Sequence, residues 1–226
     1  MSYLEFTVLI YLIISYSWSM RPWLVLKAFD LSFEEVMIAF SEQPYGGAFK
    51  QKVLAVNPNG KVPVLLDEGQ LVWDSLAICE YLAEQYPNLA LWPVDNAMRT
   101  RARCITAEMH SGFMSLRNQC GMNIRADLTA LGQKLWQADE SLRQDVARIE
   151  QIWTARPHPD GFLCGNFSIA DAFYAPVVTR FITYGLPLSE SAQQYMQTLS
   201  AHPAVQAWVT DAHAEQARVA FLEAHF

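Results

Sequence analysis

The sequence has no excess of positive charge. Its 226 residues include 16 Lys and Arg against 23 Asp and Glu, which gives a formal net charge of −7. Proteins that bind nucleic acid usually carry a basic stripe or patch that contacts the phosphates. We therefore expect no nucleic-acid partner.

Long hydrophobic runs are also missing. The apolar stretch at residues 6–14 is about nine residues long, too short to span a bilayer as a helix. It lacks the basic start and small-residue cleavage site of a signal peptide. β-Branched and aromatic residues dominate it, which favours a buried strand. We expect no membrane partner and a cytoplasmic location.

Cysteine is scarce, and no two cysteines form a C-x-x-C pair. The spacing of the four matches no zinc pattern, so we expect no metal centre. Free thiols in a reducing compartment are the simplest interpretation. The four are Cys79, Cys104, Cys120 and Cys164.

The first third of the chain alternates strand and helix patterns. β-Branched residues and turn signals predict strands at 6–14, 33–38, 62–66 and 70–73, the last two forming a hairpin around 67–69. Helical patterns occupy 19–29, with Pro22 in the first turn, 49–56 and 75–85. A loop is expected at 43–47. The order βαβαββα predicts a thioredoxin-like α/β domain at residues 1–87.

The rest of the chain has helical periodicity without strand alternation. We expect a linker at 88–97 and an all-α helical-bundle domain at 98–226. Its predicted helices are 98–120, 127–138, 140–155, 168–184, 189–199 and 203–212. An S-x-x-D capping box, Ser168 to Asp171, starts the fourth of these helices, and we interpret it as structural.

The segment Asn57-Pro-Asn-Gly-Lys-Val-Pro-Val-Leu-Leu66 is the most informative stretch. Proline is confined to the first residue, edge or bulge of a strand, and only an X-Pro bond adopts the cis form at low cost. A cis Val62–Pro63 bond would turn the Val62 N–H and C=O out of the sheet. Both groups could then pair with an extended peptide.

Asp74 and Ser75 follow at the point where a strand ends and a helix begins. Backbone N–H groups at a helix start favour negative charge. The pair can therefore bind a carboxylate, or it can serve only as a helix cap. A short peptide with a free carboxylate and amine suits such a site.

A turn rich in hydroxyl groups, Ser15-Tyr-Ser-Trp-Ser-Met-Arg-Pro-Trp23, lies between the first predicted strand and helix. A thiol with an ordinary pKa near 8.5 becomes a thiolate more readily at a helix N-terminus and beside hydrogen-bond donors. The turn contains no cysteine, so a mixed disulfide with the protein is not expected. These hydroxyls can activate a bound thiol, cap the helix, or do both.

Together these motifs, over the whole chain, resemble the glutathione transferases. The turn is similar to the Ser-Trp-Ser-x-Arg-Pro-Trp turn of a bacterial branch and, more loosely, to the zeta-class Ser-Ser-Cys turn. The resemblance implies glutathione as co-substrate, a small hydrophobic electrophile as acceptor, a role in detoxification and a homodimer. One alternative is a zeta-like glutathione-dependent cis–trans isomerase of the maleylacetoacetate type. Another is a non-catalytic binding protein on the same fold.

The resemblance also assigns roles to residues. Ser17, four residues before the arginine of the turn, is implied as the catalytic hydrogen-bond donor to the sulfur, with Tyr16, Ser15 and Ser19 as alternatives. Val62 and Ser75 would hold the peptide and its γ-glutamyl carboxylate, and Asp74 its α-amino group. Lys61 either contacts the glycyl carboxylate or is a solvated edge charge.

The acceptor would bind against the helical domain, where 108–117 offers candidates. His110, Met114 and Arg117 would share one helical stripe, and Met109, Phe113 and Leu116 another. One stripe should face the core and the other the cleft. Arg117 could receive an anionic substrate or pair within the domain, and we assign no catalytic role to these residues.

Overall fold

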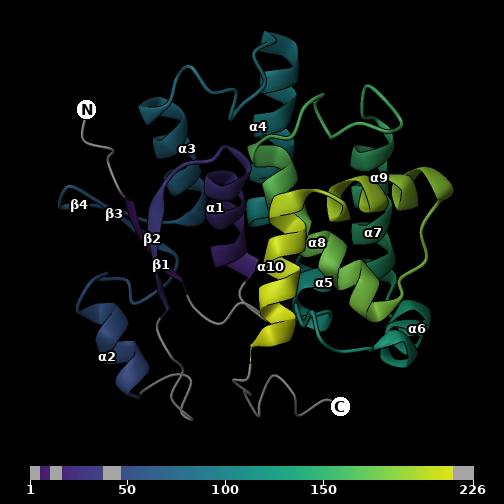
Figure 1. The fold of residues 1–226 in the computed structure, drawn as a ribbon. Coiled ribbons are helices and arrows are strands. Elements are labelled where there is room, and N and C mark those ends of the chain that lie inside the picture. Colours follow the sequence, from purple (N-terminus) through teal and green to yellow (C-terminus); the bar gives the residue numbers. More distant parts are fainter. Residues whose placement is uncertain (1–5, 11–16, 38–46, 216–226) are drawn as a thin grey trace.

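The computed structural model describes residues 6–10, 17–37 and 47–215. The first part of the chain contains a small sheet and the helices around it (Figure 1). Its elements are β1 (Phe6–Ile10), α1 (Ser17–Ala28), β2 (Phe33–Met37), α2 (Ala48–Leu54), β3 (Val64–Asp67), β4 (Gln70–Val72) and α3 (Ser75–Gln85). This order confirms the predicted βαβαββα arrangement.

The strands form one sheet in the order β2-β1-β3-β4. β1 is parallel to β2 and antiparallel to β3, and β3 is antiparallel to β4. Glu68 and Gly69 join β3 to β4 and both have positive φ, at 45° and 88°. Two positive φ values in a two-residue loop match the right-handed twist of a hairpin. The predicted hairpin is therefore confirmed.

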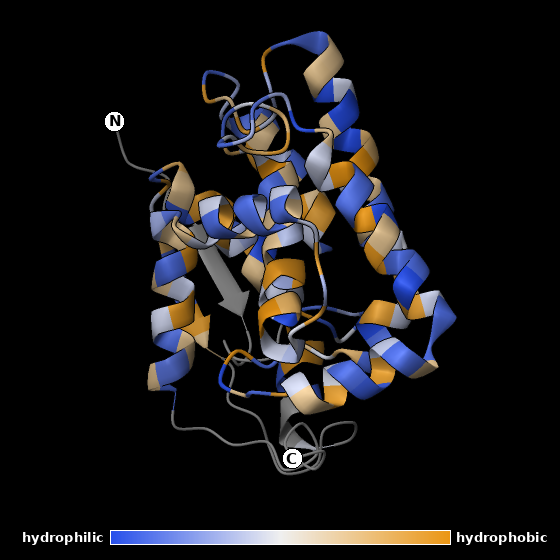
Figure 2. Cartoon of the chain, turned by 90° about the vertical axis from the view of Figure 1, so that its right-hand side faces the viewer, coloured by the Kyte–Doolittle hydropathy of each residue, from blue (hydrophilic) through white to orange (hydrophobic). Residues whose placement is uncertain are grey.

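The second part of the described chain is helical. Its elements are α4 (Asn96–Ser111), α5 (Met114–Gln119), α6 (Thr129–Ala138), α7 (Glu140–Thr154), α8 (Ile169–Tyr184), α9 (Glu190–Ser200) and α10 (Pro203–Ala214). α8 is the central helix, since nearly all of its residues are buried. In Figure 2 apolar residues face the interior of this half and hydrophilic residues its outside. No helix within the described ranges is long and apolar enough to cross a membrane.

α1 joins the two parts. In Figure 1 it lies between the sheet on one side and α8 and α10 on the other. Met20 and Leu24 are fully buried, and the Trp23 ring meets the Trp208 ring of α10 edge-on, with centroids 5.0 Å apart. Aromatic burial of this kind adds to the area removed from water. The beginning of α1 is thereby held against both halves.

The predicted start of α1 was wrong. The helix begins at Ser17 instead of Ser19, so Pro22 lies in the second turn and not in the first. Proline there lacks the N–H that would bond to the Trp18 carbonyl. Residues 19–26 are all buried, and packing on several sides outweighs that loss.

The predicted helix at 98–120 is also wrong as a single element. It is interrupted at Gly112 and Phe113, and Phe113 has left-handed φ and ψ of 54° and 46°. A Cβ on Gly112 would lie 2.7 Å from the Glu108 carbonyl oxygen, so only glycine ends α4 in this way. The two predicted stripes survive the break. Met109, Phe113 and Leu116 are buried, whereas Met114 is 52% exposed.

The remaining helix and strand predictions are confirmed to within a few residues at each end. The predicted strand residues 11–14 and 38 lie outside the described residues, as do residues 43–46 of the predicted loop. Residues 86–95, between α3 and α4, contain no helix or strand. The division of the chain at 88–97 stays a prediction.

Candidate functional site

One end of the sheet collects the predicted site residues. Leu9 lies opposite Val64, so β1 ends where β3 begins. Leu65 lies opposite Val72, so β4 ends at the same edge. The chain therefore leaves β1 towards α1, enters β3 and leaves β4 towards α3 at one end of the sheet.

Ser17 is the first residue of α1, and 7% of it is exposed. Helix starts carry N–H groups without intrahelical acceptors and the positive end of the helix dipole. Within the described part of the chain the Ser17 hydroxyl makes no hydrogen bond. Ser19 is fully buried, and its hydroxyl also has no partner among these residues. Ser15 and Tyr16, the other candidates, lie outside the described residues.

The Val62–Pro63 peptide bond is cis, as predicted. Among the described residues no hydrogen bond uses the Val62 N–H or C=O. The side chain of Asn57 holds the preceding loop, because its amide donates to the Lys61 carbonyl at 2.8 Å. The Val62 backbone groups are thus available for an extended peptide. The Lys61 side chain is exposed at the same edge.

Asp74 and Ser75 lie at the start of α3. Asp74 is the N-cap, and its Oδ1 accepts the Leu76 N–H at 2.8 Å. The peptide bond from Trp73 to Asp74 is cis as well, which the sequence does not predict. Ser75 is 1% exposed, and its hydroxyl has no hydrogen-bond partner among the described residues. A buried hydroxyl without a partner is unfavourable, so a ligand carboxylate beside the first N–H groups of α3 would satisfy it.

Arg21 lies one helical turn after Ser17 on the same face of α1. It is 1% exposed, and its guanidinium stacks on the rings of Trp18, at 4.2 Å, and Phe173, at 4.7 Å. Burial is the main cause that lowers the pKa of Arg21 to about 9. The Phe173 contact comes from α8, so α1 and the helical half together enclose this cation.

His110, at the end of α4, connects the two helix starts. Its Nδ1 lies 3.5 Å from a terminal nitrogen of Arg21, and its Nε2 lies 3.5 Å from Asp74 Oδ2. Burial lowers the pKa of His110, and the positive charges of Arg21 and Arg117 lower it further, against the effect of Asp74. The imidazole is therefore neutral at neutral pH, and we infer an Nε2–H that faces Asp74.

Arg117 completes the group from α5. Its guanidinium lies 4.7 Å from the Trp18 ring, and one of its nitrogens donates to the carbonyls of His110, at 3.2 Å, and Gly112, at 3.4 Å. Arg180 of α8 is buried behind it and donates to the Cys120 carbonyl at 2.9 Å. Three arginines thus converge on the junction between the two halves.

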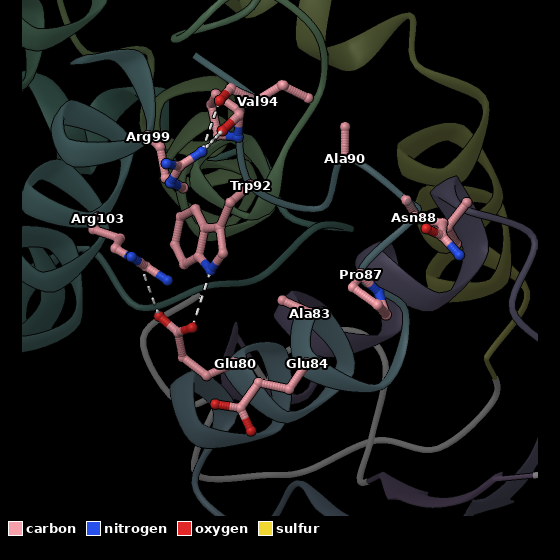
Figure 3. A pocket seen from close by; sticks show the side chains of 12 residues that line it. Glu80, Ala83, Glu84, Pro87, Asn88, Ala90, Trp92, Val94, Arg99 and Arg103 are labelled. Carbon is pink, nitrogen blue, oxygen red and sulfur yellow. Dashed lines mark hydrogen bonds and ion pairs between the residues drawn. The ribbon is translucent and has the colours of Figure 1, made fainter. Parts of the chain in front are cut away.

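A separate cavity of about 360 Å³ lies between α3, residues 87–94 and α4 (Figure 3). None of the predicted site residues lines it. Several of its polar groups pair with one another: Trp92 Nε1 donates to Glu80 at 3.1 Å, and Arg99 donates to the Val94 carbonyl at 2.7 Å. Arg103 lies 3.6 Å from Glu80. This cavity is therefore distinct from the sheet end that carries the candidate site.

Two family models match the chain. The glutathione S-transferase N-terminal domain matches residues 17–85, and the glutathione S-transferase C-terminal domain matches residues 115–211. Together they cover about three quarters of the sequence. The chain belongs to the glutathione S-transferase family.

Individual relatives of this chain differ in the activity they are named for. A probable maleylacetoacetate isomerase from Caenorhabditis elegans is 38% identical over 104 residues, and that match covers 46% of either chain. Glutathione S-transferase 1 from Dianthus caryophyllus is 28% identical over 178 residues, 78% of this chain and 77% of the plant protein. A Burkholderia glutathione transferase homologue, solved with bound glutathione, has the same fold, with a TM-score of 0.71 and 23% identity over 93% of this chain and 100% of its own.

The three buried thiols of the chain are poorly placed as nucleophiles. Burial raises the pKa of Cys79 far above its usual range, that of Cys120 to about 12 and that of Cys164 to about 11. Cys104 is exposed on α4. Because the thiolate is the reactive form, the three buried thiols are inert.

Sequence reasoning missed the group that surrounds Arg21. In the sequence Arg21 stands out only as part of a motif, and no local pattern predicts the proximity of Asp74 to His110. The spacing of four between Ser17 and Arg21 signals a shared helix face. No sequence signal pairs Arg21 with His110, because 89 positions separate them.

Proposed function

We propose that the protein is a glutathione transferase that activates the glutathione thiol through the Ser17 hydroxyl for attack on a small, largely hydrophobic electrophile. One observation carries the proposal. At a single end of the sheet, the Ser17 hydroxyl, the Val62 backbone and the buried Ser75 hydroxyl all lack hydrogen-bond partners among the described residues. A thiol peptide of the size and polarity of glutathione would supply partners for all three.

The binding roles follow the chemistry of each group. The Ser75 hydroxyl and the first N–H groups of α3 would hold the γ-glutamyl carboxylate, because a helix start attracts anions. The Asp74 carboxylate would pair with the α-amino group, and its side chain is 48% exposed and so accessible. Val62 would pair with the cysteinyl backbone. Lys61, which is exposed, would meet the glycyl carboxylate.

Ser17 would then act on the sulfur. A hydroxyl that donates a hydrogen bond to sulfur favours the thiolate, and the dipole of α1 adds to the effect. The thiol proton leaves to solvent, and the sulfur lone pair forms the new S–C bond at the electrophilic carbon. The bond to the leaving group breaks with its electron pair, or an added proton completes addition to a double bond.

The replacement Ser17→Ala tests this assignment. We expect kcat/KM with 1-chloro-2,4-dinitrobenzene to fall about tenfold to hundredfold, since hydrogen bonds to charged groups contribute ~1.5–3 kcal/mol. The pKa of bound glutathione, followed by thiolate absorbance, should rise, while glutathione affinity stays close to that of the parent. Ser19→Ala is the matched control. Full activity in Ser17→Ala together with a loss in Tyr16→Phe would show that the hydroxyl belongs to Tyr16.

A glutathione-dependent cis–trans isomerase is the second candidate. The Caenorhabditis elegans relative that is named for this activity favours it. The same thiolate would add to a conjugated double bond, the carbon–carbon bond would rotate, and elimination would release glutathione unchanged. Turnover of maleylacetoacetate with no net loss of glutathione would select the isomerase over the transferase.

Non-catalytic binding is a third possibility that one measurement separates from the other two. A protein retained on immobilised glutathione that neither conjugates nor isomerises any acceptor would act only as a binding scaffold. We also propose, from the family resemblance, a cytoplasmic homodimer that acts in detoxification. Light scattering in solution tests the dimer.

A further inference from the structure

The junction between the two halves holds more positive charge than it neutralises. Arg21, Arg117 and Arg180 converge there, and each Coulombic pair among them lowers the pKa of a partner. The only carboxylate that faces Arg21 or His110 within the described residues is that of Asp74. An accumulation of cations in a chain with a net charge of −7 requires a reason.

Arg21 supplies the deep part of this charge. It is almost wholly buried, and its Nε has no hydrogen-bond partner among the described residues. Its side-chain contacts there are the faces of Trp18 and Phe173 and one nitrogen of His110 at 3.5 Å. A buried charge without a counter-ion is costly, and π faces compensate only part of that cost.

Arg117 supplies the accessible part. It is partly exposed on α5, and its described partners are the His110 and Gly112 carbonyls, the Met114 sulfur and the Trp18 ring. Within the part of the chain that the structure describes, all of the hydrogen bonds of Arg117 come from one terminal nitrogen. Nε and the other terminal nitrogen therefore keep a free edge with the fork geometry that binds a carboxylate in a bidentate manner.

Bound glutathione would leave this excess in place. Its two carboxylates are assigned to the start of α3 and to Lys61. Its α-amino group would pair with Asp74, whose carboxylate is the only one that faces Arg21 or His110 among the described residues. The cations at the junction would then face the space beside the sulfur, with the exposed side chain of Met114 at the rim.

We propose that Arg117, backed by Arg21, forms an anion subsite that selects acceptors with a carboxylate. The inference rests on the proposed function, since it names the acceptor class for that thiol site. The carboxylate would pair with the free edge of Arg117 at the junction between the two halves. The apolar remainder of the acceptor would lie against Trp18 and Met114, with its electrophilic carbon towards the sulfur.

Two electrophiles that differ only in charge test the subsite. 4-Chloro-3,5-dinitrobenzoate and its neutral carboxamide share the reacting carbon and the leaving group. We expect the parent protein to prefer the acid and Arg117→Met to lower the acid-to-amide ratio of kcat/KM about tenfold to hundredfold. Arg117→Lys should retain part of the preference, because it keeps the charge and loses the fork. Arg103→Met removes an exposed cation outside the cleft and should keep the ratio.

Binding separates this proposal from the proposed function. Unreactive 3,5-dinitrobenzoate should bind the glutathione-loaded protein in calorimetry, about tenfold more weakly after Arg117→Met. If neither electrophile reacts but this difference is found, the transferase assignment fails and the anion subsite stands. An unchanged acid-to-amide ratio with unchanged dinitrobenzoate affinity overturns the subsite. An equal loss for both electrophiles with a raised pKa of bound glutathione also overturns it, and would mean that Arg117 stabilises the thiolate.

Discussion

Asp171 is the side chain on which the start of α8 depends. Its carboxylate accepts the Leu163 N–H and the Ser168 N–H, each at 3.0 Å, the Ser168 hydroxyl at 3.3 Å and the Tyr195 hydroxyl at 3.0 Å. The predicted capping box is therefore confirmed, and it extends further than the sequence shows. One buried acceptor serves a loop, a helix start and α9.

We expect Asp171→Ala to lower the free energy of unfolding by about 3–5 kcal/mol, because several buried donors lose their partner at once. Ser168→Ala should cost about 1 kcal/mol, the usual value for a lost cap. Tyr195→Phe should cost about as much as one hydrogen bond, ~1 kcal/mol. Urea unfolding of the three variants measures these differences. A loss in Asp171→Ala no larger than that in Ser168→Ala would contradict the shared role.

Arg21 shows why burial and charge must be considered together. Only its place in a motif is evident from the sequence, yet in the folded protein it has no counter-ion within hydrogen-bond distance among the described residues. Its guanidinium lies over the rings of Trp18 and Phe173. Buried charges of this kind cluster at functional sites.

At the scale of elements, the contact between α6 and α8 requires glycine. A Cβ on Gly132 would overlap the Tyr184 carbonyl oxygen at the end of α8. The Leu128 N–H, just before α6, donates to the Thr183 carbonyl at 2.8 Å and draws the two helices together. The close approach therefore belongs to the backbone and leaves no room for a side chain.

Gly132→Ala should destabilise the protein by about 1–3 kcal/mol, the usual range for overpacking. Helix propensity alone predicts the opposite sign, because alanine stabilises a helix by about 1 kcal/mol relative to glycine. Gly121→Ala is the control, since a Cβ there meets no atom within 4 Å. Thermal unfolding of both variants decides the matter. An increase in Tm for Gly132→Ala would show that α6 moves away from α8 easily.

The break between α4 and α5 has a similar local cause. Gly112 and the left-handed Phe113 redirect the chain. His110 and Arg117 therefore come from different helices, and a terminal nitrogen of Arg117 still donates to the His110 carbonyl at 3.2 Å. A continuous helix was the natural prediction, because the apolar spacing runs unbroken through this segment. Helical periodicity reports which side chains are apolar and does not report where the backbone turns.

At the scale of the whole molecule, His110 connects α4 to the start of α3 through Asp74. The pKa of His110 is lowered, so the unfolded chain takes up a proton at a pH where the folded protein does not. Stability should therefore fall as pH decreases below the ordinary value of 6.5. The charged groups that face the ring are Asp74, Arg21 and Arg117.

His110→Gln should flatten the decrease in Tm between about pH 7 and pH 5, because glutamine does not titrate. The difference in Tm between variant and parent at each pH separates the contribution of His110 from that of Asp171. The buried Asp171 carboxyl, with its pKa raised to about 6, contributes in the opposite direction, since its folded form binds a proton more readily. Differential scanning calorimetry over this range provides the measurement. Parallel Tm curves for parent and variant would contradict the expectation.

Much of the fold was predictable because its signals are short-range. The cis Val62–Pro63 bond, the cap at Asp74 and the box at Ser168 each depend on a few consecutive residues. The Arg21 group was not predictable, because Phe173 and His110 approach it only when the two halves pack. The start of α1 was misjudged for the same reason, since packing overrides the local preference of Pro22.

The position of α1 has a consequence for how such a protein can change. One helix begins at Ser17, covers the sheet and packs against α8 and α10. Consider a chimera that joins this first half to the helical half of a relative. In place of Trp208, the new half would need a residue that packs against Trp23. A recombination point between residues 86 and 95 would interrupt no helix or strand. It would still change the packing of α1, because α8 and α10 would be replaced. We therefore expect acceptor preference to change more readily through point substitutions on α4 and α5 than through exchange of whole halves.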